Sequence, residues 1–304
     1  MARRKSQGRA VHGIVLLDKP TGMTSNAALQ KVKRLFQANK AGHTGSLDPM
    51  ATGMLPICFG EATKVSAFLL GADKAYTVTA CLGQRTNTGD ADGQVIATAS
   101  ADAIRPEAVL SLLPRYIGEG LQVPPMYSAI KHQGQPLYKL ARQGVEIKRQ
   151  PRAICIHDIQ LLSYEKTYIS LYVHCSKGTY IRTLIDDIGQ ALGCGAHVTA
   201  LRRLYVAPYS HQPMLTLEQV QMAAQTGFLA LDSLLQPIDS ALTAWPAVYL
   251  SAAMAYDLKR GQAVQVAELP PQGLLRLYCG ATHFLGMGHV QEDGKVAPKR
   301  LMNL

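Results

Sequence analysis

The order of strand-like and helix-like segments is the feature that most constrains the fold of this chain. Residues 76–82 alternate between inward apolar and outward polar side chains, as a half-buried strand does. Residues 152–162 and 168–175 also have strand character. These segments are mixed with helical patterns without the strict alternation of βαβ units. The sequence therefore predicts an α+β fold with a mixed, largely antiparallel sheet flanked by helices.

Two of the helical patterns are well defined. Residues 25–37 carry an apolar stripe at helical spacing, and we expect Ser25 to be the N-cap. Residues 179–193 form a second amphipathic pattern that ends at Gly193. Thr216 and Gln219 have the spacing of a capping box, which predicts the start of a further helix.

The character of the chain changes around Trp245-Pro246. Beyond this point, short apolar runs are broken by Gly and Pro, which is typical of a small β-rich unit. We expect a basic N-terminal arm at 1–10, a catalytic domain at 11–246 and a small β-rich domain at 247–304.

The charge of the chain indicates a polyanionic partner. Lys and Arg number 31 against 21 Asp and Glu, a net charge of +10. Nine of the basic residues fall within residues 1–40 with one acid, and six within 131–152 with one acid. A solubilising surface is one interpretation, and a nucleic-acid-binding surface is the other.

Several function classes lack their sequence signals. No phosphate-binding loop or dinucleotide-binding glycine motif is present, so a nucleotide cofactor is not expected. The GDADG segment fails as a calcium loop because Thr88 and Ala99 occupy positions that need acids. A zinc site at His174, Cys175, Cys194 and His197 fits no usual spacing, and no metal is expected.

The cellular location follows from similar arguments. The six cysteines form no Cys-x-x-Cys pair, which suits reduced thiols. No apolar run approaches the roughly 18 residues of a membrane span, and the N-terminus does not resemble a secretory signal. We expect a cytoplasmic protein that does not enter a membrane.

The segment GHTGSLDPMATGMLPICFGEATK, residues 42–64, is the best candidate for a catalytic loop. Asp48 lies between Gly45 and Pro49, with little side-chain bulk around it. Such a loop lets another molecule approach closely and holds the carboxylate outward. An isolated Asp-Pro pair is more often an ordinary turn, so the surrounding sequence decides between the two interpretations.

That surrounding sequence resembles the TruB family of tRNA pseudouridine synthases. Residues 42–64 look like the family's catalytic motif, and four more blocks resemble the family in the expected order, at 16–26, 75–93, 123–144 and 175–206. The resemblance implies the pseudouridine synthase fold and, more loosely, a PUA-like RNA-binding domain at the C-terminus. It also implies isomerisation of uridine 55 in the T-loop of elongator tRNAs, without cofactor or metal.

The resemblance assigns the catalytic residues. Asp48 occupies the position of the essential aspartate, which attacks the ribose C1′ or removes a proton from C2′ to give a glycal; both routes remain open. Arg182 matches the arginine that pairs with this aspartate. Tyr76 matches the tyrosine that stacks on the target base, and its hydroxyl is a candidate for proton removal at C5.

It also assigns residues that bind substrate. His43 matches the histidine that helps displace the flipped nucleotide. Tyr180 and Leu201 match walls of the base pocket. Lys19 and Pro20 match a first motif whose role is mainly to support the catalytic loop. The candidate phosphate ligands are Lys31, Lys33, Arg34, Lys64, Lys131, Arg142, Arg202 and Arg203.

Two other functions fit the same fold. One is a non-catalytic tRNA-binding or tRNA-folding chaperone, and the other is a guide-RNA-dependent pseudouridine synthase. A protein that only binds RNA has no need of Asp48, Arg182 and Tyr76 together. Nothing in the sequence demands more than a monomer.

Overall fold

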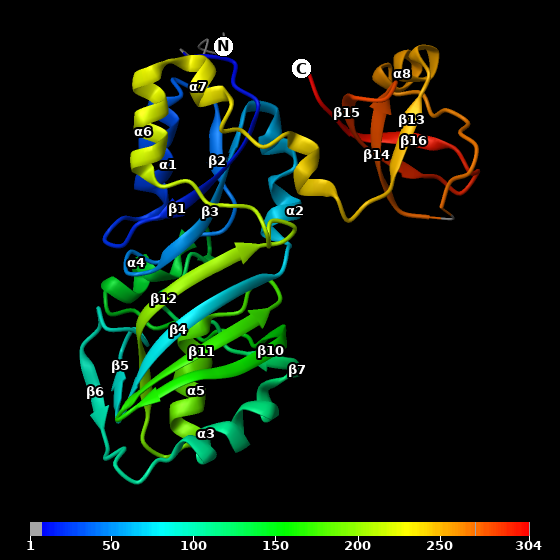
Figure 1. Cartoon of the computed structure of the whole chain (residues 1–304). Helices are drawn as coiled ribbons and strands as arrows, with labels where there is room; N and C mark the ends of the chain where they lie inside the picture. Colours follow the sequence, from blue (N-terminus) through cyan, green and yellow to red (C-terminus); the bar gives the residue numbers. More distant parts are fainter. Residues whose placement is uncertain (1–7, 271, 304) are drawn as a thin grey trace.

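The computed structural model describes residues 8–270 and 272–303, and it contains one large mixed sheet (Figure 1). The sheet order is β1-β3-β12-β4-β11-β10-β7, with β2 paired to β3. All of its pairs are antiparallel except β12 with β3. The strands are β1 (Gly13–Lys19), β2 (Ala41–His43), β3 (Thr52–Phe59), β4 (Lys74–Leu82), β7 (Gly118–Gln122), β10 (Arg152–Glu165), β11 (Tyr168–Cys175) and β12 (Ala196–Val206). The predicted α+β class is confirmed.

Helices cover both halves of this sheet on one face, the face against which α5 packs, which is called the inner side below. Helix α5 (Ile181–Ala191) buries Leu184, Ile185 and Ile188 against β4 and β11, as its apolar stripe predicts. Helices α1 (Ser25–Leu35) and α6 (Leu217–Thr226) pack together over β1 and β3. The remaining short helices are α2 (Ser66–Leu70), α3 (Pro106–Leu112), α4 (Leu137–Arg142) and α7 (Phe228–Asp232), with 3₁₀ turns at Gly60–Lys64, Leu113–Tyr116 and Ile238–Leu242.

The helix starts test two capping predictions. Thr216 and Gln219 form the expected capping box of α6. The prediction for α1 is wrong by one residue, because the side chain of Thr24, not Ser25, accepts the hydrogen bond from Ala27 N–H. Ser25 lies inside the first turn with its hydroxyl buried against another segment, which the helical pattern cannot show.

A glycine allows two strands to meet beneath the loop that carries Asp48. Gly53 has φ +99° and is paired with Arg203 of β12. A Cβ at Gly53 would lie 2.1 Å from the carbonyl oxygen of Arg203, so no side chain fits there. The start of β3, four residues after Asp48, is therefore fixed directly against β12.

A second, four-stranded sheet follows the large one in sequence and lies to its side (Figure 1). It contains β13 (Ala247–Leu250), β14 (Leu274–Cys279), β15 (His283–Val290) and β16 (Val296–Leu301), with helix α8 (Ala252–Lys259) against it. Tyr278, Phe284 and Met302 share a buried cluster with residues of β1 and β3. This unit is thereby attached to the main body by an apolar interface.

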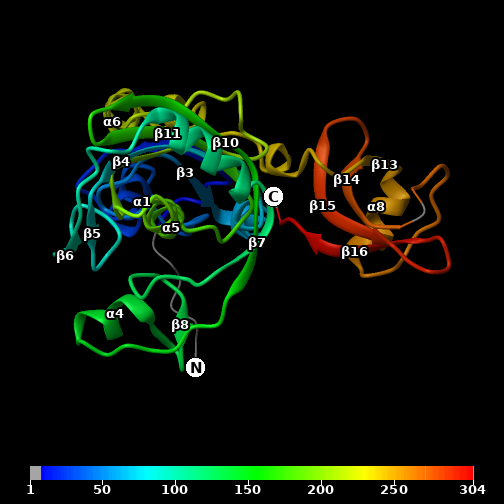
Figure 2. The same cartoon turned by 90° about the horizontal axis from the view of Figure 1, so that it is seen from below.

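Two short hairpins lie outside the two main sheets. Strands β5 (Gln84–Thr86) and β6 (Val95–Thr98) pair beside the large sheet. Strands β8 (Lys131–His132) and β9 (Gln135–Pro136) precede α4, and Figure 2 shows this segment extending from the body on the side of α5. Of the expected N-terminal arm, residues 1–7 lie outside the described residues. Arg9 is ion-paired with Asp232, and its guanidinium lies 3.9 Å from the Phe228 ring centroid.

Candidate active site

Asp48 lies in the loop between β2 and β3, which buried contacts hold in place. Lys19 is fully buried beneath it, and its ammonium group donates to the carbonyl oxygens of Pro20 at 2.8 Å, Met23 at 2.7 Å and Pro49 at 3.4 Å. Burial lowers the pKa of Lys19 to about 8. Lys19 therefore holds three carbonyl groups from two segments together, and it supports Pro49, the residue after Asp48.

A serine hydroxyl fixes the other side of Asp48. The Oγ of Ser25 accepts a hydrogen bond from Leu47 N–H at 2.7 Å and donates one to Leu47 O at 3.0 Å. Both residues are buried. Ser25 thus satisfies both backbone groups of the residue before Asp48, and the loop is held from α1 as well as from β1.

Arg182 is paired with the carboxylate of Asp48. Its Nε lies 3.0 Å from Asp48 Oδ2, and its side chain is 6% exposed. The other guanidinium nitrogens donate to the carbonyl oxygens of Thr88 and Tyr127, each at 2.7 Å. These bonds use the fixed fork geometry of the guanidinium, so the direction of Nε toward Asp48 is determined by the protein.

Asp90 supplies a second carboxylate to the same arginine. Its Oδ2 lies 3.4 Å from Arg182 NH1, and its Oδ1 accepts hydrogen bonds from Thr88 Oγ1 and Asp92 N–H. Asp90 is buried. Two carboxylates therefore share one buried guanidinium, and the net charge of the group is negative.

This arrangement sets the acidity of Asp48. Burial raises its pKa above the ordinary 3.8, Arg182 opposes that rise, and the neighbouring charges of Asp90 and Asp92 add to it. The side chain is 41% exposed, and its exposed part faces the pocket described next. Asp48 is thus a partly desolvated carboxylate, open on the side from which a substrate enters.

A hollow of about 1220 Å³ opens over Asp48, and it brings together most of the predicted site residues. Tyr76 and Leu201 are nearly buried in its wall. Tyr180 and His43 also line it, together with Arg182. The Nδ1 of His43 is buried without a hydrogen-bond partner in the described structure, and burial lowers the pKa of this histidine. The volume is ample for a nucleotide with its flanking backbone.

Burial and a neighbouring buried arginine have opposite effects on the acidity of Tyr76. Burial raises the pKa of Tyr76 above its ordinary value of 10, and the hydrogen-bonded Arg203 guanidinium partly offsets this. The hydroxyl is therefore protonated at neutral pH. Tyr76 offers a flat, uncharged ring and a hydrogen-bonding hydroxyl to the pocket.

Eight predicted residues lie outside the pocket lining, and four of them are the candidate phosphate ligands Lys31, Lys33, Arg34 and Lys131. Lys19 and Pro20 lie beneath or beside the loop, consistent with a supporting role. Lys64 donates to Leu301 O and pairs with Glu61 at the base of the second sheet. Arg202 makes a bidentate pair with Asp18 at 2.9 and 2.7 Å, on the sheet face away from Arg203.

The prediction that Arg203 contacts phosphate is wrong. Its side chain is 1% exposed, and it donates to Met54 O at 2.6 Å and Gly45 O at 3.1 Å. In a strand, adjacent residues point to opposite faces, so only one residue of the Arg202-Arg203 pair can face outward. Arg203 instead supports the floor of the pocket under Tyr76.

Sequence reasoning missed three further residues of the site. Asp90 lies in the GDADG segment, whose sequence shows only that it does not fit a calcium loop. Its neighbours Thr88 and Asp92 indicate a polar turn, but they do not indicate that Asp90 is paired with Arg182. Lys74 also lines the pocket. Its ammonium group donates a hydrogen bond to Leu70 O at 3.3 Å, and burial lowers its pKa to about 8. Ser25 was interpreted only as a helix cap.

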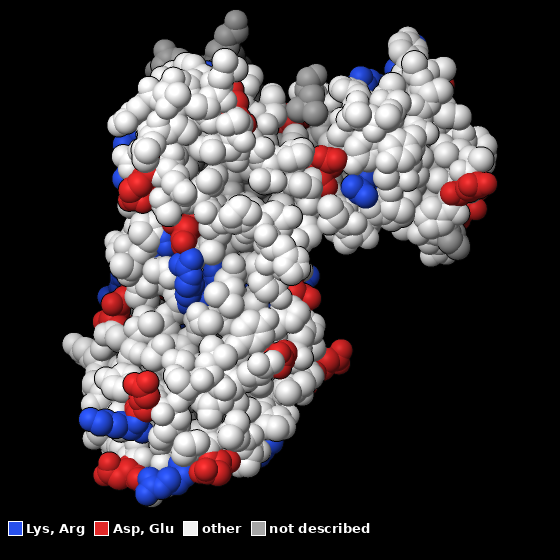
Figure 3. Space-filling model, in the orientation of Figure 1, with Lys and Arg blue, Asp and Glu red and all other residues white. Residues whose placement is uncertain are grey.

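The outer face of the large sheet carries few charges. Figure 3 views the molecule from the side opposite α5, and its Lys and Arg side chains are sparse and lie among Asp and Glu. The pocket is formed by residues at the start of α5 and by loops on the inner side. Within the described residues, no helix is both long and apolar enough to cross a membrane.

Comparison with known proteins shows that the chain is a pseudouridine synthase. Three family profiles match the chain, namely "TruB family pseudouridylate synthase (N terminal domain)" at 33–181, "tRNA pseudouridylate synthase B C-terminal domain" at 182–243 and "Pseudouridine synthase II TruB, C-terminal" at 246–302. The chain belongs to the TruB family of pseudouridylate synthases.

Its relatives are similar over their whole length. The chain is 53% identical to "tRNA pseudouridine synthase B" of Nitrosococcus oceani, covering 99% of this chain and 97% of that protein. It is also 53% identical to the protein of the same name from Aeromonas salmonicida, covering 99% and 96%. Among solved structures, a Cbf5-Nop10-Gar1 complex contains a chain with the same fold, at 24% identity and a TM-score of 0.73, covering 96% of this chain and 84% of that one.

Proposed function

We propose that this enzyme isomerises uridine to pseudouridine at position 55 in the T-loop of elongator tRNAs. The observation that carries the proposal is the Asp48-Arg182 pair, 3.0 Å apart at the bottom of a pocket of nucleotide size. The relatives named tRNA pseudouridine synthase B support tRNA as the substrate. Asp48, Arg182 and Tyr76 are the proposed catalytic residues.

Asp48 does its work as a carboxylate. The reaction breaks the bond between N1 of uracil and C1′ of ribose, and forms a bond between C5 and C1′. An ionised Asp48 attacks C1′ directly or removes a proton from C2′, and either route lets uracil leave as an anion. Partial desolvation makes the carboxylate more reactive, while Arg182 fixes its orientation. C5 then bonds to C1′. In the first route this breaks the Asp48–C1′ ester and frees the carboxylate, and in the second route Asp48 returns its proton to C2′. The proton on C5 is finally lost to solvent and N1 takes one up, so that the reaction is a net isomerisation.

Tyr76, Leu201 and Tyr180 hold the detached base. The ring of Tyr76 forms a stacking surface, which is worth about 1–3 kcal/mol for each base. Its raised pKa makes the phenolate rare at neutral pH, which favours stacking over proton removal as the main role. The base must turn within the pocket before C5 faces C1′, and flat apolar walls permit that rotation without breaking hydrogen bonds.

Substrate entry requires base flipping. Extracting a stacked base takes a few kcal/mol, which contacts with the RNA must supply. The ring of His43, whose buried Nδ1 has no hydrogen-bond partner among the described residues, lies at the pocket wall and is suited to occupy the space that the uridine leaves. Lys131 and Arg142 lie on the projecting β8–β9 and α4 segment (Figure 2), on the pocket side, and are proposed phosphate ligands.

The domain arrangement fits an RNA modification enzyme. We propose that residues 11–246 form the catalytic domain and that 247–304 form a PUA-like RNA-binding domain. The second sheet begins at Ala247, and its apolar contact with β1 and β3 places it beside the catalytic body. We further propose that the enzyme works as a cytoplasmic monomer, without cofactor.

Release of tritium from T-stem-loop RNA labelled at C5 of uridine tests the proposal. We expect the wild-type enzyme to release tritium without added metal or nucleotide. Asp48→Asn should release none while binding the RNA within about tenfold of the wild type, because Asp48 acts in the transition state. Asp102→Asn is a matched control, since Asp102 is exposed and outside the pocket. Release by Asp48→Asn at the wild-type rate would contradict the assigned mechanism.

The same assay separates the alternatives. RNA binding without any release by the wild type would favour a tRNA-folding chaperone. Release that requires an added guide RNA would favour a guide-dependent synthase.

A further inference from the structure

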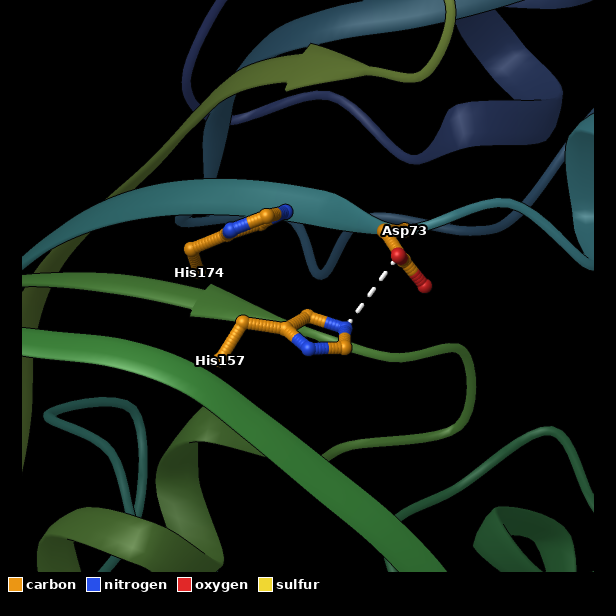
Figure 4. Close-up of side chains that lie close together, drawn as sticks. All are labelled: Asp73, His157 and His174. Atoms are coloured by element: carbon orange, nitrogen blue, oxygen red, sulfur yellow. Dashed lines mark ion pairs between the residues drawn. The ribbon is translucent and has the colours of Figure 1, made fainter. Parts of the chain in front are cut away.

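Three side chains with metal-binding atoms meet on the face of the large sheet opposite α5 (Figure 4). Asp73 precedes β4, His157 lies in β10 and His174 lies in β11. These three strands are neighbours in the sheet. The flanking Val173 and Cys175 belong to the inner core, so His174 points to the other face. The cluster is therefore separate from the pocket that holds Asp48.

The distances suit a metal ion. The Nε2 of His157 lies 3.2 Å from Oδ2 of Asp73. The ligand atoms of all three residues lie within 4.8 Å of one another. In a tetrahedral zinc site, bonds of about 2.0–2.1 Å place neighbouring ligand atoms about 3.4 Å apart. His157 is exposed and the other two residues are partly exposed, so small side-chain rotations complete the geometry.

The surroundings of the cluster position its ligands. A register shift between Ile156 and Asp158 leaves His157 unpaired in the ladder with β11, which directs its ring toward Asp73. The Nδ1 of His157 lies 3.6 Å from Cys155 Sγ. A contact on Nδ1 leaves the Nε2 lone pair for a metal, as outer contacts do in known metal sites. The carbonyl of Asp73 accepts a hydrogen bond from Ala207 N–H, which fixes its backbone.

An ion pair alone does not account for the arrangement. An exposed His-Asp pair contributes little, and it needs only one histidine. Here a second imidazole lies beside the first, with ring centroids 4.7 Å apart. Two imidazoles and a carboxylate together form a ligand set that divalent zinc favours.

We propose that Asp73, His157 and His174 form a binding site for a zinc-type divalent transition-metal ion on the outer face of the catalytic sheet. Three protein ligands leave a fourth position for water. The ion would link the segment before β4 to β10 and β11. Lys74, the next residue after Asp73, lines the catalytic pocket, so the metal would stabilise the start of β4 next to that pocket.

Calorimetric titration of the metal-free, full-length protein with zinc chloride tests the proposal. We expect one ion per chain, with a dissociation constant that rises tenfold or more in each of Asp73→Asn, His157→Gln and His174→Gln. His283→Gln is a matched control, since His283 is an exposed histidine at the start of β15, outside the cluster, and should bind zinc within twofold of the wild type. Magnesium should not replace zinc, because it prefers oxygen ligands.

Absence of zinc binding, or a dissociation constant that changes less than tenfold in both histidine variants, would overturn the proposal. Nuclear magnetic resonance of the wild-type imidazoles provides a readout that needs no variant. Zinc should shift the ring signals of His157 and His174 and leave that of His283 unchanged; zinc shifts confined to other histidines or to the cysteines would also overturn it.

Discussion

Removal of the Ser25 hydroxyl should disturb catalysis without touching the reacting groups. In Ser25→Ala, the backbone N–H and C=O of Leu47 both lose their partner in a buried place. Each unsatisfied buried group costs about 1–3 kcal/mol, so a rigid loop would lose several kcal/mol in total. The loop relieves part of this by moving Leu47 toward water, and that movement displaces Asp48. We expect a loss of about 2 kcal/mol in unfolding free energy. A displacement of about 1 Å should lower kcat about 10- to 100-fold.

Urea unfolding and single-turnover tritium release measure the two effects. Thr216→Ala is the control, because it removes the N-cap of α6, and Thr216 belongs neither to the loop nor to the pocket lining. It should lower the unfolding free energy by about 1 kcal/mol and leave kcat unchanged. If Ser25→Ala retained kcat within threefold of the wild type, the idea that this hydroxyl positions the catalytic loop would be refuted.

Four further outcomes are expected. The acid limb of kcat should have its midpoint above pH 3.8, because Asp48 must be ionised and burial raises its pKa; a pH–rate profile checks this. Because the fold disfavours ionised Asp48, its contribution to stability falls as pH rises through that range, so Asp48→Asn should unfold at pH 7 with no lower free energy than the wild type in urea titrations. Above pH 8, kcat should fall as Lys19 loses one of its three N–H donors, and this limb should persist in Lys74→Gln. RNA affinity measured by filter binding should fall steeply with salt, and Arg142→Ala should reduce the slope by about one.

Periodic patterns within single segments correctly predicted the strand β4 and the helix α5. The alternation in 76–82 gives the buried face of β4, and the stripe in 179–193 gives α5. Both follow from periodicity within one element, which a sequence displays directly. The capping box at Thr216 is of the same kind. The six cysteines are unpaired, in agreement with the expectation of reduced thiols.

The role of a polar residue depends on which segment of the folded chain lies against its side chain, and the sequence does not show this. Ser25 has the composition of a helix cap, yet its partner is Leu47, which lies 22 residues further along the chain. Arg203 is basic and sits beside Arg202, yet strand geometry buries it under Tyr76. A side chain alone does not reveal whether its charge faces water or a carbonyl group.

The sequence by itself determined the α+β class, the glycine- and proline-rich loop around Asp48 and the basic balance of the chain, because these depend on neighbours in the chain or on simple sums of charge. Only the tertiary structure decided that Arg182 is shared between Asp48 and Asp90, that Lys19 and Ser25 hold the loop from below, and that Asp73 meets two histidines on the opposite face. Each of these contacts joins segments far apart in sequence. These contacts stabilise the fold because the groups are buried and lie about 3 Å apart. Both conditions exist only once the strands have paired.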